Sequence, residues 1–591
     1  MPKSKLELLS IGHLLVCLLW LALVSLTSFA QQAQRTDQPL TLPTREALAR
    51  PLLLHAESVS ATFDPASRSL VLYRSAGAWL PLDHSHAIRL YRESFAAARE
   101  SAPTIRHYLE EAILSDLLPL SPPDVLDLLP GAAPATKSRL YAALMNFSIL
   151  QNDYVAAVHV FERAASDGVL PLRATAHLLA SLPTSASAER TNIFTTAMQF
   201  YQAHPDRELP WHWTIADLVA RFYKRLPDDL VLQAIHIALS QGEPQNGGQL
   251  GMGAGERSIA FHSNYDFQLF AVAPALQQLD PALAAGLLAQ HAEAAANLRR
   301  YPQGLPSFYE GDPYLGKDAL APSHQKPVGL QLYNTIEEAQ NLKRMDMGLE
   351  FTVPRNLNLL GVTGSSVSFA PPDSPEAAVL GSGNSCPSDL VHSLELAKAV
   401  PVLRKVAAAC NGPIGGQWCS YNDTFPRASV IQVLAERCTY SGDSARARVA
   451  LQEQLEIVEE IPEEHRINYL ATAADLYLRI GDREAATGII QKGFAAARGL
   501  YDCEIVSPQL QGFPKGIWNS AEAFRRMITL GVNASMDATL KAVSEIPDPS
   551  LRELEQVMIA RALLGIPVRR NMTASAGSFC TLEAEVTYDQ L

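Results

Sequence analysis

Apolar residues recur with a helical period along most of this chain. From Thr214 to Arg225 they form one stripe at positions i, i+3, i+4, i+7 and i+8, which is the pattern of an amphipathic α-helix with one buried face. Thr214 and Asp217 stand at the spacing of a capping box at the start of that helix. The segment Ser85–Glu100 shows similar apolar spacing, and Ser85 is expected to cap it. The periodicity therefore predicts an all-α fold.

Three stretches interrupt the helical pattern. Gly242–Gly255 is rich in glycine and is expected to be a flexible loop. Tyr301–Pro327 is rich in Pro and Gly, and Thr352–Pro387 mixes Pro, Gly, Ser and Val without a period, which is typical of an interdomain linker. Strand-like alternation is clearest in Ser69–Tyr73 and Ser365–Phe369, and both segments are short.

The length of the chain, 591 residues, is too great for one hydrophobic core. Because apolar residues make up 48% of the sequence and charged residues 18%, we expect folded domains and not a disordered chain. The interruptions predict a helical region without cysteine at about 40–350, a linker at 351–387, and a helical repeat region with six cysteines at 388–591.

The first thirty residues have the order of an export signal. Lys3 and Lys5 give a basic start, Ile11–Leu26 is apolar, and Ser28 and Ala30 put small residues at a cleavage site. The apolar run is shorter than the roughly 20 residues that a spanning helix needs. We therefore expect cleavage after Ala30, an extracytoplasmic protein in the periplasm or outside the cell, and no later membrane span. An uncleaved signal that tethers the protein is the alternative.

The cysteines also fit an exported protein. Cys17 leaves with the signal, and an even number remains, all in the last two-fifths of the chain. An even number in an oxidising compartment favours disulfides. Cys410 and Cys419 bracket a Gly- and Pro-containing loop that allows them to pair, while zinc-type spacings are absent from the sequence. The six are Cys386, Cys410, Cys419, Cys438, Cys503 and Cys580.

The formal net charge is −13 at pH 7. An acidic protein is repelled by nucleic acid and by anionic lipid surfaces, and no run of Lys or Arg is present to offset this repulsion. Nucleic acid is therefore not an expected partner.

An internal similarity with a spacing of 39 residues marks the C-terminal region, where Gly442-Asp443 and Gly481-Asp482 each stand between two amphipathic stretches. Asp482 is expected to cap the helix that follows it. The sequence therefore predicts helical hairpins with a glycine at each turn.

These hairpins resemble tetratricopeptide repeats, in which small residues stand where two helices cross closely. About three units, roughly 100 residues, carry the resemblance, with a spacing of 39 where the family has 34. It implies antiparallel helix pairs stacked as one or two α-solenoids with a groove that binds protein or peptide. Ordinary core helices of an all-α domain are the alternative. The residues at repeat-defining positions are Tyr477, Gly481, Ala486, Gly442, Ala447, Ala157, Phe161 and Ala164.

Candidate chemistry is sparse. Asp83, His84 and His86 form the densest set of possible metal ligands, but residues two apart on a helix point to different sides. Gly251–Gly255 lacks the sequence context of a phosphate-binding loop, and the chain has no G-x-S-x-G or H-E-x-x-H motif. No catalytic residue or metal ligand is assigned, and no cofactor is expected.

The sequence favours an exported, non-enzymatic scaffold that binds an unidentified protein or peptide. An exported all-α glycoside hydrolase or lyase is the alternative, because acidic residues are plentiful. A scaffold is expected to show a face of mixed polar and apolar residues without strongly perturbed acids. An enzyme is expected to place two carboxylates about 5–10 Å apart in a deep pocket.

Overall fold

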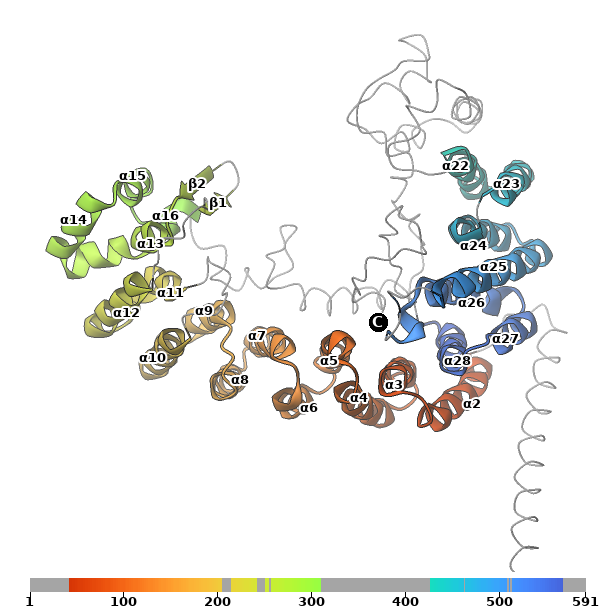
Figure 1. Ribbon diagram of the computed structural model, residues 1–591, viewed down its shortest axis with the longest axis horizontal. Helices are drawn as coiled ribbons and strands as arrows, with labels where there is room; N and C mark the ends of the chain where they lie inside the picture. Colours follow the sequence, from red (N-terminus) through yellow and green to blue (C-terminus); the bar gives the residue numbers. More distant parts are fainter. Residues whose placement is uncertain are drawn as a thin grey trace, which may run out of the picture. The chain divides into compact units, whose positions relative to one another are not determined.

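The computed structural model describes residues 42–204, 214–241, 250–254, 257–309, 426–461, 463–506, 510 and 513–566. Almost all of these residues are helical (Figure 1), which confirms the predicted all-α class. The expected signal at residues 1–30, the expected linker at 351–387, and Cys410 and Cys419 lie outside these ranges. The described helices form two compact units: the first contains the described residues up to Ala112 and those from Pro426 onward, and the second contains the described residues from Ile113 to Tyr309.

The first unit joins helices from both ends of the chain. Helix α28 packs on α2 and α3, so the last described helix lies against the first ones. Consecutive helices also pack together, among them α3 with α4, α22 with α23, α24 with α25 and α25 with α26. The helices of this unit are α2 (Leu42–Ser60), α3 (Pro65–Trp79), α4 (His84–Arg99), α5 (Pro103–Leu117, which crosses the boundary), α22 (Pro426–Tyr440), α23 (Ser444–Glu459), α24 (Glu463–Arg479), α25 (Arg483–Glu504), the 3-10 turn η7 (Lys515–Ile517), α26 (Asn519–Ala534), α27 (Met536–Ser544) and α28 (Pro549–Leu563).

In its described residues, the second unit is helical apart from one β-hairpin. Strands β1 (Leu250–Ala254) and β2 (Arg257–Phe261) pair antiparallel, with Met252 opposite Ile259. The other elements are α6 (Pro122–Leu128), the 3-10 turn η1 (Leu129–Gly131), α7 (Pro134–Leu150), α8 (Tyr154–Ser166), α9 (Leu172–Ser181), α10 (Ser187–Ala203), α11 (Ile215–Phe222), η2 (Tyr223–Arg225), α12 (Asp228–Ser240), α13 (Asn264–Leu279), α14 (Pro281–Gln290), α15 (Ala292–Arg300) and α16 (Leu305–Tyr309).

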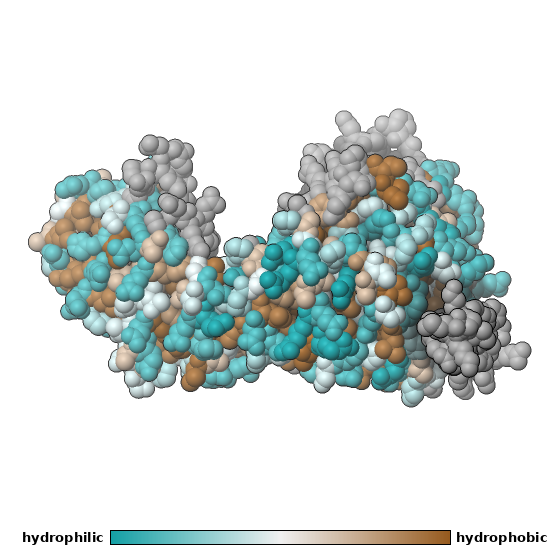
Figure 2. Space-filling model, turned by 60° about the horizontal axis from the view of Figure 1, so that its bottom comes forward, coloured by the Kyte–Doolittle hydropathy of each residue, from teal (hydrophilic) through white to brown (hydrophobic). Residues whose placement is uncertain are grey.

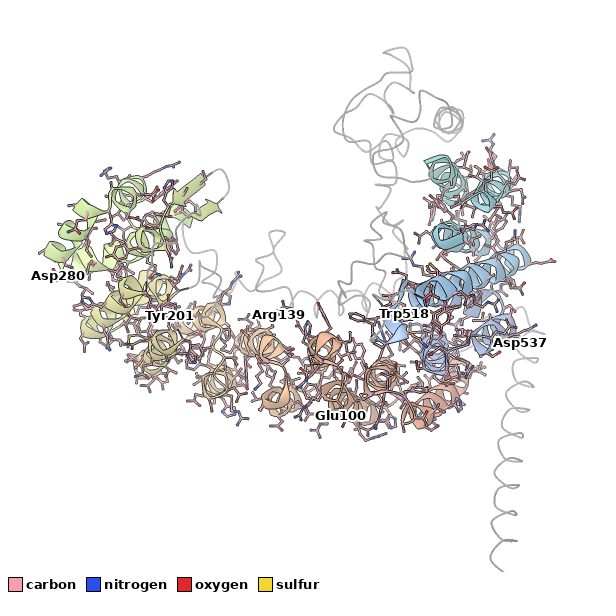
Figure 3. The ribbon with its side chains drawn as sticks, in the orientation of Figure 1. Glu100, Arg139, Tyr201, Asp280, Trp518 and Asp537 are labelled. Carbon is pink, nitrogen blue, oxygen red and sulfur yellow. The ribbon has the colours of Figure 1, made fainter. Side chains whose placement is uncertain are left out.

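Local signals in the sequence account for many helix boundaries. Aspartate side chains accept hydrogen bonds from the first free N–H groups of several helices, which stabilises each helix start. Glycines with positive φ follow the ends of α8, α22, α24 and α28, where residues with a Cβ are strained. The capping aspartates are Asp64, Asp83, Asp153, Asp280 (labelled in Figure 3), Asp443, Asp482 and Asp548.

Three local expectations are wrong. Ser69–Tyr73 is not a strand but part of α3, which is buried on most of its surface, so its apolar pattern has no clear helical period. Ser85 does not cap α4, because the carboxylate of Asp83 accepts from the His86 N–H and the helix already begins at His84. The end of the glycine-rich stretch Gly242–Gly255 forms β1, because pairing with β2 supplies partners for its backbone groups.

Candidate functional site

The most distinctive cluster of polar side chains lies on α22 and α24 in the first unit. The two helices pack against each other. Helix α23 packs on α22, and α25 packs on α24, so the four helices form two consecutive hairpins (Figure 1). The 39-residue spacing places Glu436 of α22 and Asp475 of α24 at equivalent positions, and it does the same for Tyr440 and Arg479. Two adjacent helices therefore present a matched row of side chains. We use the name polar face for the surface that these side chains form together with the neighbouring polar residues of α24 and α26. Its members are Glu436, Tyr440, Asn468, Asp475, Arg479, Glu522 and Arg526.

Glu436 is the most perturbed acid of the polar face. Burial raises its pKa to about 7, a hydrogen bond from Gln432 lowers it in part, and the negative charge of Asp475 raises it further. Gln432 Nε2 donates to Glu436 Oε1 at 3.0 Å. Gln454 Nε2 of α23 in turn donates to Gln432 Oε1 at 3.2 Å. A buried chain of two amides thus orients the Glu436 carboxylate.

The neighbouring acid and base form an ordered pair. Arg479 Nε donates to Asp475 Oδ2 at 2.8 Å, one helical turn away. The guanidinium of Arg479 also lies 5.5 Å from the ring centre of Tyr440, a cation–π arrangement across the two helices. Tyr440 remains 44% exposed, so an aromatic ring is available at the surface beside these charges.

The same face continues onto α26. Arg526 donates from its guanidinium to Asn468 of α24, which stands two helical turns before Asp475 on the same side of the helix. Arg526 Nε also donates to Glu522 at 3.2 Å. Glutamate, aspartate, arginine, asparagine and tyrosine therefore form one mixed surface over three helices.

The repeat-defining residues are divided between the two units: Tyr477, Ala486 and Ala447 belong to helices of the first unit, and the other three side chains belong to α8 of the second. Tyr477, Ala486, Ala447, Ala157, Phe161 and Ala164 are all buried, and the alanines let the helices of each pair approach closely. Gly442 and Gly481 have φ of 80° and 82° at the turns after α22 and α24. The caps Asp443 and Asp482 follow them, and for Asp482 this confirms the prediction.

Other perturbed acids are enclosed by their own structural partners. Burial raises the pKa of Asp217 to about 6, opposed by the charge of Arg221 and by bonds from Thr214, and the predicted capping box of these two residues is confirmed. Burial also raises the pKa of Glu555 to about 8, although Arg525 Nε lies 3.6 Å from its carboxylate. Asp217 therefore belongs to the start of α11, and Glu555 is fully buried beside Arg525, whereas Glu436 is partly exposed.

The histidines singled out in the sequence have structural partners. His86 Nε2 lies 2.9 Å from Glu57 Oε2 of α2, and the centre of its ring lies 4.4 Å from that of Trp79, with the two planes tilted by 46°. His84 is the first residue of α4. Within the described ranges, no three His, Cys, Asp or Glu side chains come together as metal ligands.

Cysteine and surface hydrophobic residues add little to this site. Cys503, near the end of α25, takes part in a disulfide bond, and Cys438 is buried in α22. Hydrophobic and hydrophilic residues are interspersed over the helices on the face that Figure 2 shows. None of the helices in the described part of the chain is both long and apolar enough to cross a bilayer.

Sequence reasoning missed the polar face itself, although its signal was present. The 39-residue spacing that relates the two turn glycines also relates Glu436 to Asp475 and Tyr440 to Arg479.

Comparison of the chain with protein-family models, with curated proteins and with solved structures gave no match.

Proposed function

We propose that this protein is an exported, non-enzymatic scaffold whose tetratricopeptide-like α-solenoid binds a protein or peptide on the polar face. The observation that carries the proposal is the row formed by Glu436, Asp475, Arg479 and Tyr440 at equivalent positions of consecutive hairpins. Mixed charged and aromatic side chains in a repeated register give a partner many orientation-dependent contacts. The disulfide at Cys503 supports an oxidising, extracytoplasmic location. Cleavage of the signal after Ala30 is part of the proposal and rests on the sequence.

The charges of the face favour a partner segment that carries Lys or Arg. Asp475 is close enough to Glu436 for its negative charge to raise the pKa of Glu436. A cationic group placed between them relieves that repulsion, so its binding is coupled to ionisation of Glu436. Tyr440 adds an exposed aromatic surface for the aliphatic part of such a side chain.

Site-specific photo-crosslinking tests the scaffold proposal. A photoreactive phenylalanine analogue at Tyr440 is expected to capture one partner reproducibly in the native compartment. The matched control carries the same analogue at Val449, which is exposed on the second helix of the same hairpin. Asp475→Arg is expected to abolish capture from position 440. Equal capture from both positions, or capture unaffected by Asp475→Arg, contradicts a partner site on the polar face.

An exported glycoside hydrolase or lyase is the second candidate. The acid pair favours it, because the raised pKa of Glu436 departs from the expectation that a scaffold face carries no strongly perturbed acid. Glycoside cleavage uses one protonated and one ionised carboxyl group, and a Glu436 pKa of about 7 next to Asp475 provides this combination near neutral pH. Against it, Asp475 is already bonded to Arg479 at 2.8 Å.

Polysaccharide turnover separates the two candidates. The enzyme candidate requires that Glu436→Gln and Asp475→Asn each abolish release of reducing ends from polysaccharides, while Glu456→Gln on α23 leaves it unchanged. Absence of turnover by the wild-type protein, together with capture from position 440, favours the scaffold.

A further inference from the structure

The β-hairpin of the second unit has one edge closed by side chains. Three residues on one side of α15 bind the main chain of β2 and of the residue after it. Arg300 Nη1 donates to Ser258 O at 3.3 Å, and Asn297 Nδ2 donates to Ala260 O at 3.4 Å. The carboxylate of Glu293 accepts from the His262 N–H at 2.8 Å. Alternate positions along the outer side of β2 are therefore occupied by α15.

The hairpin is also anchored on its buried side. The ring of Phe261 lies 5.7 Å from that of Phe267 and 5.4 Å from that of Phe270, both on α13. Ile259 is buried as well. A two-stranded hairpin is marginal by itself, and these contacts hold its backbone in a fixed position on the second unit.

The open edge belongs to β1, and its two glycines face it. Because α15 binds the main chain at 258, 260 and 262, the residues of β2 that bond to β1 are those at 257, 259 and 261. Their partners are Ala254, Met252 and Leu250. The N–H and C=O groups of Gly251 and Gly253 therefore point away from β2. Among the described residues, the sheet has no third strand to meet them.

The open edge is self-complementary. Gly251 and Gly253 stand symmetrically about Met252, so a two-fold axis at position 252 places Gly251 of one copy opposite Gly253 of the other. Both outward-facing residues then form hydrogen-bonded pairs of an antiparallel ladder, with Met252 opposite itself in the intervening non-hydrogen-bonded pair. An isologous contact of this kind closes after two copies.

We propose that β1 pairs with β1 of a second copy of this chain, which makes a four-stranded sheet across a two-fold dimer. The contact involves a different unit from the polar face and does not depend on the proposed function. An unpaired strand edge is a template for just such pairing. Because β1 has only five residues, the interface is small and the dimer is expected to be weak. Its population should therefore rise with protein concentration.

Cysteine trapping in the full chain tests the pairing. Met252→Cys is expected to give a reducible dimer under mild oxidation, because position 252 lies on the two-fold axis where opposing Cα atoms are closest. The matched control is Ser258→Cys on β2, whose main chain faces α15. Cross-linking of Met252→Cys no greater than that of Ser258→Cys and of the wild type overturns the proposal.

A backbone variant distinguishes strand pairing from chance collision. Gly253→Pro removes the outward N–H in each copy but leaves the bonds to β2, and it is expected to weaken dimerisation by roughly 10- to 30-fold in sedimentation velocity. Gly253→Ala keeps the N–H and is expected to dimerise like the wild type. Both variants should keep the wild-type far-UV dichroism. Equal dimerisation of the Pro and Ala variants, or a monomeric wild type at all concentrations, rejects the paired edge.

Discussion

Glu436 shows how one side chain acquires its properties from neighbours that are distant in sequence. Its ordinary pKa of 4.5 rises to about 7 in the fold because burial disfavours the charged form and Asp475 adds a negative charge. The folded state therefore holds the Glu436 proton more tightly than the unfolded chain does. Its contribution to stability is full below about pH 4.5 and is lost as pH rises through about 7.

Glu436→Gln is expected to remove this pH dependence. The amide keeps an acceptor for Gln432 and carries no charge, so the variant should be more stable than the wild type at pH 8, by on the order of 2–3 kcal/mol. At pH 4.5 the two proteins should unfold alike. Urea unfolding at both pH values measures the difference, with the exposed Glu456→Gln as control. An equal difference at the two pH values would show that Glu436 does not titrate as stated.

Glycine is favoured at position 481 because of the backbone conformation there, and not because a side chain would clash with its neighbours. Its φ is +82° and nothing lies within 4 Å of the position that a Cβ would occupy. Gly481→Ala is therefore expected to cost about 1 kcal/mol from backbone strain alone. Gly481→Asn should cost less, because asparagine tolerates this region better. Thermal unfolding of both variants is the measurement, and a larger loss for Asn than for Ala would contradict the conformational explanation.

At the level of elements, close packing of α25 on α26 depends on a second kind of glycine. A Cβ at Gly493 would overlap the thioether of Met527 on α26, whereas a Cβ at Gly488, five residues earlier on the same helix, meets nothing. A substitution at Gly488 therefore changes stability through helix propensity alone, whereas one at Gly493 also changes the contact between α25 and α26.

Alanine at these two positions is expected to have effects of opposite sign. Gly488→Ala should stabilise the protein by about 0.5–1 kcal/mol, because alanine has the higher helix propensity. Gly493→Ala should destabilise it by about 1–3 kcal/mol, because Met527 must leave its position. Urea unfolding tests both variants, and stabilisation by Gly493→Ala would mean that α25 and α26 pack more loosely than described.

Element boundaries were the most predictable part of the structure. The capping box of Thr214 and Asp217 and the cap Asp482 are encoded within four residues of chain, so local spacing is enough to find them. Helix α3 was misread over Ser69–Tyr73 because it is buried on most sides. Strand β1 was missed because its pairing partner, and not its own glycine-rich sequence, defines it.

At the scale of the whole molecule, the first unit is completed by helices from opposite ends of the chain. Leu70 of α3 and Leu554 of α28 both border Gly516 of η7, where an added Cβ would overlap each of them. Arg561 of α28 likewise lies against Gly77 of α3. The stability of α28 is therefore expected to depend on residues almost 500 positions away.

Leu70→Ala tests this coupling. The substitution should destabilise the first unit by about 2–4 kcal/mol and speed amide hydrogen exchange in α28 while leaving α8 unchanged. Leu144→Ala, a buried leucine of the second unit, should have the converse effect. Exchange in α28 that is insensitive to Leu70→Ala would show that the two ends of the chain do not share a cooperative unit.

The sequence by itself determined the helical class, the starts of α11 and α25, and the glycines that follow α22 and α24. These features depend on a 3.6-residue period and on hydrogen bonds between residues within a few positions of each other. Only the tertiary structure decided that α28 packs on α2 and α3, that Asp475 lies beside Glu436, and that β1 has an open edge. Each of these depends on which buried surfaces meet across long stretches of chain, and no local pattern specifies that choice.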